Sequence, residues 1–140
     1  MNNFSCYLAG GMQNLSMSQQ LEWRNKAEEF FKKVECNYKV LTTNPPKKYN
    51  FFESKHRSER EVMEYDLYKV RNSDLVLVNF NDERSIGTSM ELMLAKELHI
   101  PVIGINDRKV NLHPWLLESC TRICYSLDEA LEHIKDFYLN

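Results

Sequence analysis

The sequence lacks the features that mark several large classes of protein. Its 18 Lys and Arg residues do not outnumber its 20 Asp and Glu residues. A formal net charge of -2 does not favour binding to duplex DNA, which is a polyanion. The amino-terminal residues have no basic flank and only a short apolar run, so they predict neither a signal peptide nor a membrane span. We therefore expect a cytoplasmic protein whose ligands are small molecules rather than nucleic acid polymers or membranes.

Cysteine is scarce, and its spacing excludes the usual cysteine-based sites. The chain has no CxxC pair and no histidine near a cysteine at the spacing of a zinc site. Repeats and low-complexity segments are also missing. We expect reduced, buried thiols rather than disulfides or metal ligands at Cys6, Cys36, Cys120 and Cys124.

The pattern that is present is an alternation of short apolar runs with longer helical patterns. At 140 residues, of which 43% are hydrophobic, the chain is long enough for one domain with a core of its own. The alternation is typical of βαβ units, in which helices cover both faces of a parallel sheet. We expect strands at 4–10, 38–43, 74–80, 100–105 and 122–127, and helices at 18–34, 58–72, 88–99 and 126–138.

Five parallel strands in this order predict an α/β fold with a doubly wound, flavodoxin-like (Rossmann-like) sheet in the order 2-1-3-4-5. In that order ligands bind between the first and third strands, beyond their carboxyl ends. The first strand ends at Tyr7 to Gly10, and the third runs into the segment SIGTSMEL, residues 85–92. Both segments should therefore border the ligand site.

An acid, Glu91, lies in a segment that is otherwise built to be buried. On a helix it shares a face with Leu94, Ala95 and Leu98. If the helix begins near Thr88, Glu91 lies in its first turn, where unpaired N–H groups and the helix dipole favour a negative charge. The acid then either caps the helix or points, ionised, into a cleft.

A second acid interrupts the apolar stripe of the preceding helix. Asp66 must be buried or line a pocket there, unless an arginine such as Arg71 or Arg57 neutralises it. Tyr7, on the first strand, either delivers its hydroxyl near the strand's carboxyl end or packs as a core tyrosine. The interrupted stripe comprises Val62, Met63, Leu67 and Val70.

Two carboxylates beside a phenol suit the cleavage of a glycosidic bond. One acid attacks the anomeric carbon and forms a covalent glycosyl-enzyme, and the other assists with protons. The two acids need different environments, so that one is charged while the other holds a proton. We expect Glu91, at a helix start, to be the nucleophile and Asp66, in apolar surroundings, to hold the proton.

These residues resemble a known family. YLAGGM at the end of the first strand, Asp66 eight residues before the strand SDLVLV, and GTSME followed by AKELHIPVIGI are similar to the nucleoside 2-deoxyribosyltransferases. They are also similar to the related 2'-deoxynucleoside 5'-monophosphate N-glycosidases. The resemblance spans Cys6 to about Phe137. It implies one domain over 1–140, no metal or redox cofactor, and a homo-oligomer whose sites are completed by a neighbouring subunit.

The resemblance also implies roles for individual residues. Glu91 would take the 2-deoxyribosyl group, Tyr7 would orient or polarise that carboxylate, and Asp66 would hold the sugar hydroxyl or relay a proton to the base. The residues expected to bind the substrate are Gly10, Gly11, Met12, Asp82, Ser85, Gly87, Thr88 and Asn111.

The sequence departs from the transferase pattern six positions before Glu91. Transferases typically have an acid there that contacts the base, whereas this chain has Ser85, as do the N-glycosidases, which use serine to hold a 5'-phosphate. Asp82 in the same loop could replace the missing acid. Asn111, in VNLHPW, resembles the transferase asparagine that reaches into a neighbour's site, which favours transfer.

Two further segments allow either a purely structural or a functional interpretation. The loop PPKKYNFFESKHRSER follows the second strand and is either a solvated basic loop or a lid whose aromatics stack on a base and whose cations attract phosphate. The helix of Glu91 is apolar on nearly all sides, which favours a subunit interface. Trp23 and Trp115 could line a neighbour's pocket, but we expect them to pack.

The sequence therefore predicts an enzyme that cleaves the N-glycosidic bond of 2'-deoxynucleosides or their 5'-monophosphates. The reaction would pass through a covalent deoxyribosyl-Glu91 intermediate, and the sugar would move to another nucleobase. The alternative is transfer to water, which makes the protein a monophosphate N-glycosidase. Further alternatives are a glycohydrolase of a larger nucleotide such as NAD and a nucleotide-sensing module without turnover.

Overall fold

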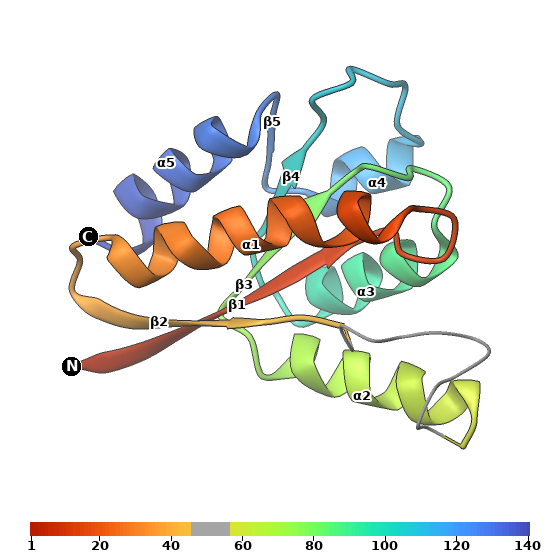
Figure 1. Cartoon of the computed structure of the whole chain (residues 1–140), viewed down its shortest axis with the longest axis horizontal. Helices are drawn as coiled ribbons and strands as arrows, with labels where there is room; N and C mark the ends of the chain where they lie inside the picture. The colour runs from red at the N-terminus through yellow and green to blue at the C-terminus, as the bar shows by residue number, and fades with distance from the viewer. Residues whose placement is uncertain (46–56) are drawn as a thin grey trace.

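Strands and helices alternate along the chain, as the sequence predicts (Figure 1). The structure is a computed structural model that describes residues 1–45 and 57–140. The elements are β1 (Asn2–Gly10), α1 (Met17–Lys33), β2 (Tyr38–Thr43), α2 (Glu59–Arg71), β3 (Leu75–Asn79), α3 (Ile86–Glu97), β4 (Val102–Ile105), α4 (Pro114–Ser119), β5 (Arg122–Cys124) and α5 (Leu127–Tyr138).

The strands form one parallel sheet in the order β2-β1-β3-β4-β5. This confirms the predicted flavodoxin-like, doubly wound α/β fold. β1 lies between β2 and β3, so the strand order reverses beside it and the loops after β1 and β3 emerge at the same edge of the sheet.

The two faces of the sheet bury separate apolar cores. Phe4, Cys6 and Leu8 of β1 pack with α1 and α5, whereas Tyr7 and Ala9 face the opposite side, with α2, α3 and α4. In Figure 1, α1 and α5 lie along one side of the sheet and α2 and α3 along the other. The predicted alternation of β1 is therefore confirmed, and it directs Tyr7 toward α3.

Serine side chains begin the helices that flank the site. Ser16 forms a capping box with Gln19 at the start of α1, and Ser58 accepts a hydrogen bond from the Glu61 N–H at the start of α2. The helix predicted at 88–99 instead begins at Ile86, because Ser85 serves as its N-cap, and it ends at Glu97.

A short helix, α4, is an element that the sequence patterns did not predict. It begins with Pro114, whose missing N–H is not needed at a first helical position. Only Leu116 and Ser119 of its six residues are buried. Trp23 packs in the core as expected, but the expectation is wrong for Trp115, which is 71% exposed because this single short helix covers little surface.

The expectation of buried thiols holds for two of the four cysteines. Cys6 and Cys124 are buried, Cys36 and Cys120 are half-buried, and all four thiols are free. Within residues 1–45 and 57–140, no helix has both the length and the apolar character needed to cross a membrane.

Candidate active site

A cavity of about 750 Å³ opens at the carboxyl ends of β1 and β3. Its walls come from the loop after β1, from α2, and from the segment that leads into α3. This is the switch point that the strand order predicted for a ligand. Of the predicted site residues, those that line the cavity are Gly10, Met12, Asp66, Asp82, Ser85, Gly87, Thr88 and Glu91.

Glu91 is joined to Tyr7 at the back of this cavity. Glu91 is 6% exposed, and Tyr7 is fully buried. The Tyr7 hydroxyl donates a hydrogen bond to Oε2 of Glu91, although the two residues are 84 positions apart in the chain. The hydrogen bond fixes the carboxylate against the end of β1, while the residue still lines the cavity.

Glu91 lies deeper in α3 than the sequence suggested. Because α3 begins at Ile86, Glu91 is in the second helical turn, and the first turn contains no acid. The unpaired N–H groups of a helix start therefore do not compensate this carboxylate, as we had expected from a start near Thr88. The hydrogen bond from Tyr7 supplies compensation instead.

Burial dominates the ionisation of Glu91. It raises the pKa of the carboxyl to about 8, and the charge of Asp66 adds to the rise, while the Tyr7 hydrogen bond and Arg24 oppose it. Glu91 is the more deeply buried of the two acids, and burial raises the pKa of both carboxyls.

Asp66 projects from α2 into the same cavity. Its Oδ1 atom is buried and has no hydrogen-bond partner within the described parts of the chain. Burial raises the pKa of Asp66 to about 7, and the positive charge of Arg24 opposes the rise. A carboxyl in this state can hold or release a proton near neutral pH.

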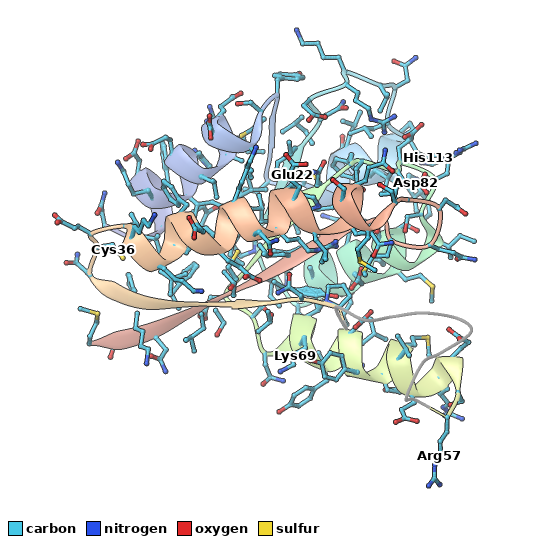
Figure 2. All side chains as sticks on the ribbon, viewed as in Figure 1. Glu22, Cys36, Arg57, Lys69, Asp82 and His113 are labelled. Carbon is cyan, nitrogen blue, oxygen red and sulfur yellow. The ribbon has the colours of Figure 1, made fainter. Side chains whose placement is uncertain are left out.

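The counter-charge of Asp66 is not one of the arginines that the sequence suggested. Arg71 is exposed at the end of α2, and Arg57 points away from the body of the protein (Figure 2). Among the described residues, the cation that acts on Asp66 is Arg24, from α1.

Arg24 is the principal residue of this region that the sequence analysis missed. It is 1% exposed, and its guanidinium lies 4.8 Å from the centroid of the Trp23 ring. A signal was present, because Arg24 precedes Ala27 by three positions and Phe31 by seven, and so lies on the buried face of the helix.

The start of α3 forms the polar rim of the cavity. The backbone N–H of Thr88 donates to Ser85 Oγ at 3.3 Å, and the Thr88 hydroxyl donates to the same atom at 2.9 Å. Asp82 accepts a hydrogen bond from the Arg84 N–H at 3.2 Å. Arg60 and Arg84 line the cavity together with Asp82, Glu59 and Glu64, so cations and acids share it.

The loops after β1 and β3 pack tightly against each other. The Gly11 N–H donates to Asn81 Oδ1 at 2.9 Å, and a Cβ atom at Gly11 would lie 2.7 Å from the Cβ of Asp82. Gly11 therefore permits the approach of the two loops rather than lining the cavity. Asn81, which makes this link, was not identified from the sequence.

Asn111 does not line this cavity as described, whereas the described ends of the predicted lid contribute Pro45, Glu59 and Arg60 to its lining. Asn111 is exposed, and among the described residues it does not contribute to the lining. Its reach into a neighbouring subunit stays a prediction. The lid residues that lie outside the described residues are Lys47, Lys48, Tyr49, Phe51, Phe52, Lys55 and His56.

Comparisons with known proteins bear on the fold. No family model and no curated protein match the sequence. Among solved structures, a conserved protein from Enterococcus faecalis V583 is 14% identical, with a TM-score of 0.74 over 95% of this chain and 98% of that one.

Two 2-deoxyribosyltransferases have similar structures. The enzyme from Bacillus psychrosaccharolyticus, described as a biocatalyst for nucleoside synthesis, is 18% identical, with a TM-score of 0.70 over 91% of this chain and 90% of that one. The enzyme from Leishmania mexicana is 13% identical, with a TM-score of 0.67 over 97% and 99%. The chain therefore has the doubly wound α/β fold of these 2-deoxyribosyltransferases.

Proposed function

We propose that this protein cleaves the N-glycosidic bond of 2'-deoxynucleosides or their 5'-monophosphates and transfers the deoxyribosyl group to another nucleobase. The observation that carries the proposal is the buried carboxylate of Glu91, held by the Tyr7 hydroxyl at a cavity that also contains Asp66. The fold shared with two 2-deoxyribosyltransferases supports it.

The first half-reaction replaces the base by Glu91. The ionised carboxylate attacks C1' of the sugar through Oε1, because Oε2 is engaged by Tyr7. As the ester bond forms, the C1'–N bond breaks and its electron pair stays on the departing base. Asp66 supplies the proton that this base takes up, which its raised pKa allows near neutral pH.

The second half-reaction regenerates the carboxylate. A nitrogen of the incoming base attacks C1', the ester bond to Glu91 breaks, and the proton of that nitrogen returns to Asp66. Transfer to water follows the same sequence, with a water oxygen in place of the nitrogen. The identity of the acceptor is therefore the difference between the two candidate activities.

The rim of the cavity bears on this choice. Asp82 lines the cavity and could meet the base as the acid of the transferase pattern does, which favours transfer. Ser85, Arg60 and Arg84 line it as well, and a hydroxyl with two cations suits a 5'-phosphate. Hydrolysis of 5'-monophosphates is therefore the second candidate function.

The proposal includes a homo-oligomer. Ile86 and Met90, on the rim of the cavity, are 76% and 53% exposed, and Met93 one turn further along α3 is 37% exposed. An apolar helix face of this kind favours contact with a neighbouring copy, from which Asn111 would complete the site. Sedimentation equilibrium would test it, and a strictly monomeric, active protein would contradict it.

Base release and base exchange test the activity. The purified protein is incubated with each 2'-deoxynucleoside, each 5'-monophosphate or NAD, with and without a second free base, and the products are separated by chromatography. Exchange only when a second base is present indicates transfer, and release without it indicates hydrolysis. Binding of the nucleotides without any release would favour the sensing module.

Substitution at Glu91 tests the covalent step. Glu91→Gln should abolish release and exchange, because an amide does not attack C1', while Glu97→Gln on the exposed end of the same helix serves as the matched control. Mass spectrometry of the wild-type protein after a brief incubation should detect one deoxyribosyl group on Glu91. Substantial activity of Glu91→Gln would contradict the assignment.

Substitution at Ser85 tests whether the cavity binds a 5'-phosphate. Ser85→Asp places a negative charge at the rim, where it would repel a 5'-phosphate but not a neutral nucleoside. The value of kcat/KM for monophosphates should therefore fall more than the value for nucleosides. Equal losses for both substrates would count against a phosphate site at Ser85.

A further inference from the structure

Arg24 is a fully buried cation whose hydrogen bonds end on backbone oxygens. Within the described residues, its guanidinium donates to the carbonyl of Gln20 at 2.7 Å and to those of Leu8 and Gly10 at 3.3 Å each. Burying a charge costs several kcal/mol unless other groups compensate it. Neutral carbonyls compensate only part of that cost, so a negative charge nearby is to be expected.

Arg24 lies beside the part of β1 that extends beyond the end of β2. The pairing of β1 with β2 stops at Tyr7 and Thr43. The Ser5 carbonyl accepts from Asp74 on the β3 side, so by alternation the carbonyls of Leu8 and Gly10 face the side where β2 has ended. Arg24 takes the place of the missing strand and holds the end of β1 that begins the cavity.

The charge of Arg24 acts on the tyrosine and the two carboxyls that carry the proposed chemistry. It interacts electrostatically with Tyr7 of β1, Asp66 of α2 and Glu91 of α3, and with Glu28 of its own helix. Near neutral pH, one positive charge therefore faces two carboxyls that share protons. When one of the two carboxyls is ionised, the charges of Arg24, Asp66 and Glu91 sum to zero.

We propose that Arg24 is a positioning residue that anchors the end of β1 and makes a single ionised carboxyl in the Asp66 and Glu91 pair the favoured state of the site. The consequence for rate rests on the proposed function. In that reaction Glu91 loses its charge as the ester forms, and Asp66 gains one as it gives its proton to the base. The sum with Arg24 therefore stays zero, and no uncompensated charge develops in a buried space.

The test compares Arg24→Met, which removes the charge, with Arg24→Lys, which keeps it, and with Arg71→Met, the same change at an exposed arginine of α2. The carboxyl carbons of Glu91 and Asp66 are titrated by NMR, with Glu91→Gln and Asp66→Asn for assignment. Arg24→Met should raise the pKa of the first carboxyl to ionise by about one unit or more, a tenfold change in the ionisation equilibrium. Arg24→Lys should raise it by much less, and Arg71→Met should leave it unchanged.

The same shift should appear in the kinetics. The acidic limb of the pH profile of kcat/KM should move upward in Arg24→Met by the amount seen in the titration, and Arg24→Lys should restore most of it. Arg24 would be only a hydrogen-bonding anchor if Met and Lys lowered activity equally and moved neither the titration nor the limb. If the wild-type protein released no base from any substrate, the proposed function would fail, and the NMR titration would still decide the role of Arg24.

A second measurement covers the case in which Arg24→Met does not fold. Combining Asp66→Asn with Glu91→Gln removes both carboxyls of the site, so that Glu28 of its own helix is the remaining carboxylate that acts on the buried cation. We expect the double variant to be less stable in urea than the sum of the two single effects predicts, because each single variant retains one carboxyl. Additive effects would overturn the proposal.

Discussion

Replacing Glu91 by glutamine should stabilise the folded chain, and the gain should grow with pH. Glutamine has nearly the same shape and can still accept the hydrogen bond from Tyr7, so the change removes mainly the ionisable proton. The pKa of Glu91 is about 8 in the folded chain, against an ordinary value of 4.5 that applies to the unfolded chain. The folded chain therefore binds this proton more tightly than the unfolded chain does.

The sign and size of the effect follow from proton linkage. Between pH 4.5 and about 8, the unfolded chain holds fewer protons at Glu91, so the wild-type free energy of unfolding falls as the pH rises. Each pH unit in this window costs about 1.4 kcal/mol, and across the window the loss is about 5 kcal/mol at most. We expect Glu91→Gln to match the wild type near pH 4 and to be about 3 to 5 kcal/mol more stable at pH 9.

Urea unfolding at a series of pH values measures the difference. The wild type, Glu91→Gln and the exposed control Glu97→Gln are compared at each pH, so that all other titrating groups cancel. The curve of Glu91→Gln should diverge from that of the wild type above pH 5 and run parallel to it again above pH 9. Parallel curves throughout would refute the idea that the folded chain holds Glu91 in a proton-retaining environment.

Three other predictions concern the reaction and the cavity wall. Tyr7→Phe removes the hydrogen bond that favours the ionised form of Glu91, so the pKa of Glu91 should rise. The value of kcat/KM at pH 7 should then fall at least about tenfold. An unchanged pH profile would contradict this. Asp66→Asn should move the acidic limb of the pH profile of kcat/KM to lower pH, because the charge of Asp66 raises the pKa of Glu91. It should also slow base release about 10² to 10⁴-fold, because the proton donor is lost. Gly11→Ala should lower the free energy of unfolding by about 1 to 3 kcal/mol and raise KM, because its methyl group meets Asp82 at 2.7 Å; thermal unfolding and initial rates would check both.

The acids of the site were predictable because each breaks an apolar pattern. Asp66 interrupts a helical stripe, and Glu91 interrupts a segment with apolar residues on either side, so periodicity alone indicated that both are covered. The same criterion applied to α1 would have found Arg24, which shares a face with Ala27 and Phe31. It was missed because an arginine in an amphipathic helix normally extends its charged end to water.

Other features depended on information that periodicity does not contain. The two-residue difference in the start of α3 came from capping by Ser85, and it moved Glu91 out of the first turn. The link between Asn81 and Gly11 joins two loops 70 positions apart, so no local pattern could reveal it. The strand order was accessible, because alternating strands and helices leave few topologies for a parallel sheet.

The tight contact between the loops after β1 and β3 divides the cavity into a fixed wall and an adjustable one. Residue 11 has no room for a side chain, and the Tyr7 and Glu91 pair is locked in the core, so variation on this side would disturb the reacting groups. The opposite wall, on α2, presents Val62, Met63 and Leu67, which are half-buried or exposed. Evolution or design could therefore change the shape of the ligands that the cavity admits through these residues of α2, while the Tyr7 and Glu91 pair stays constant.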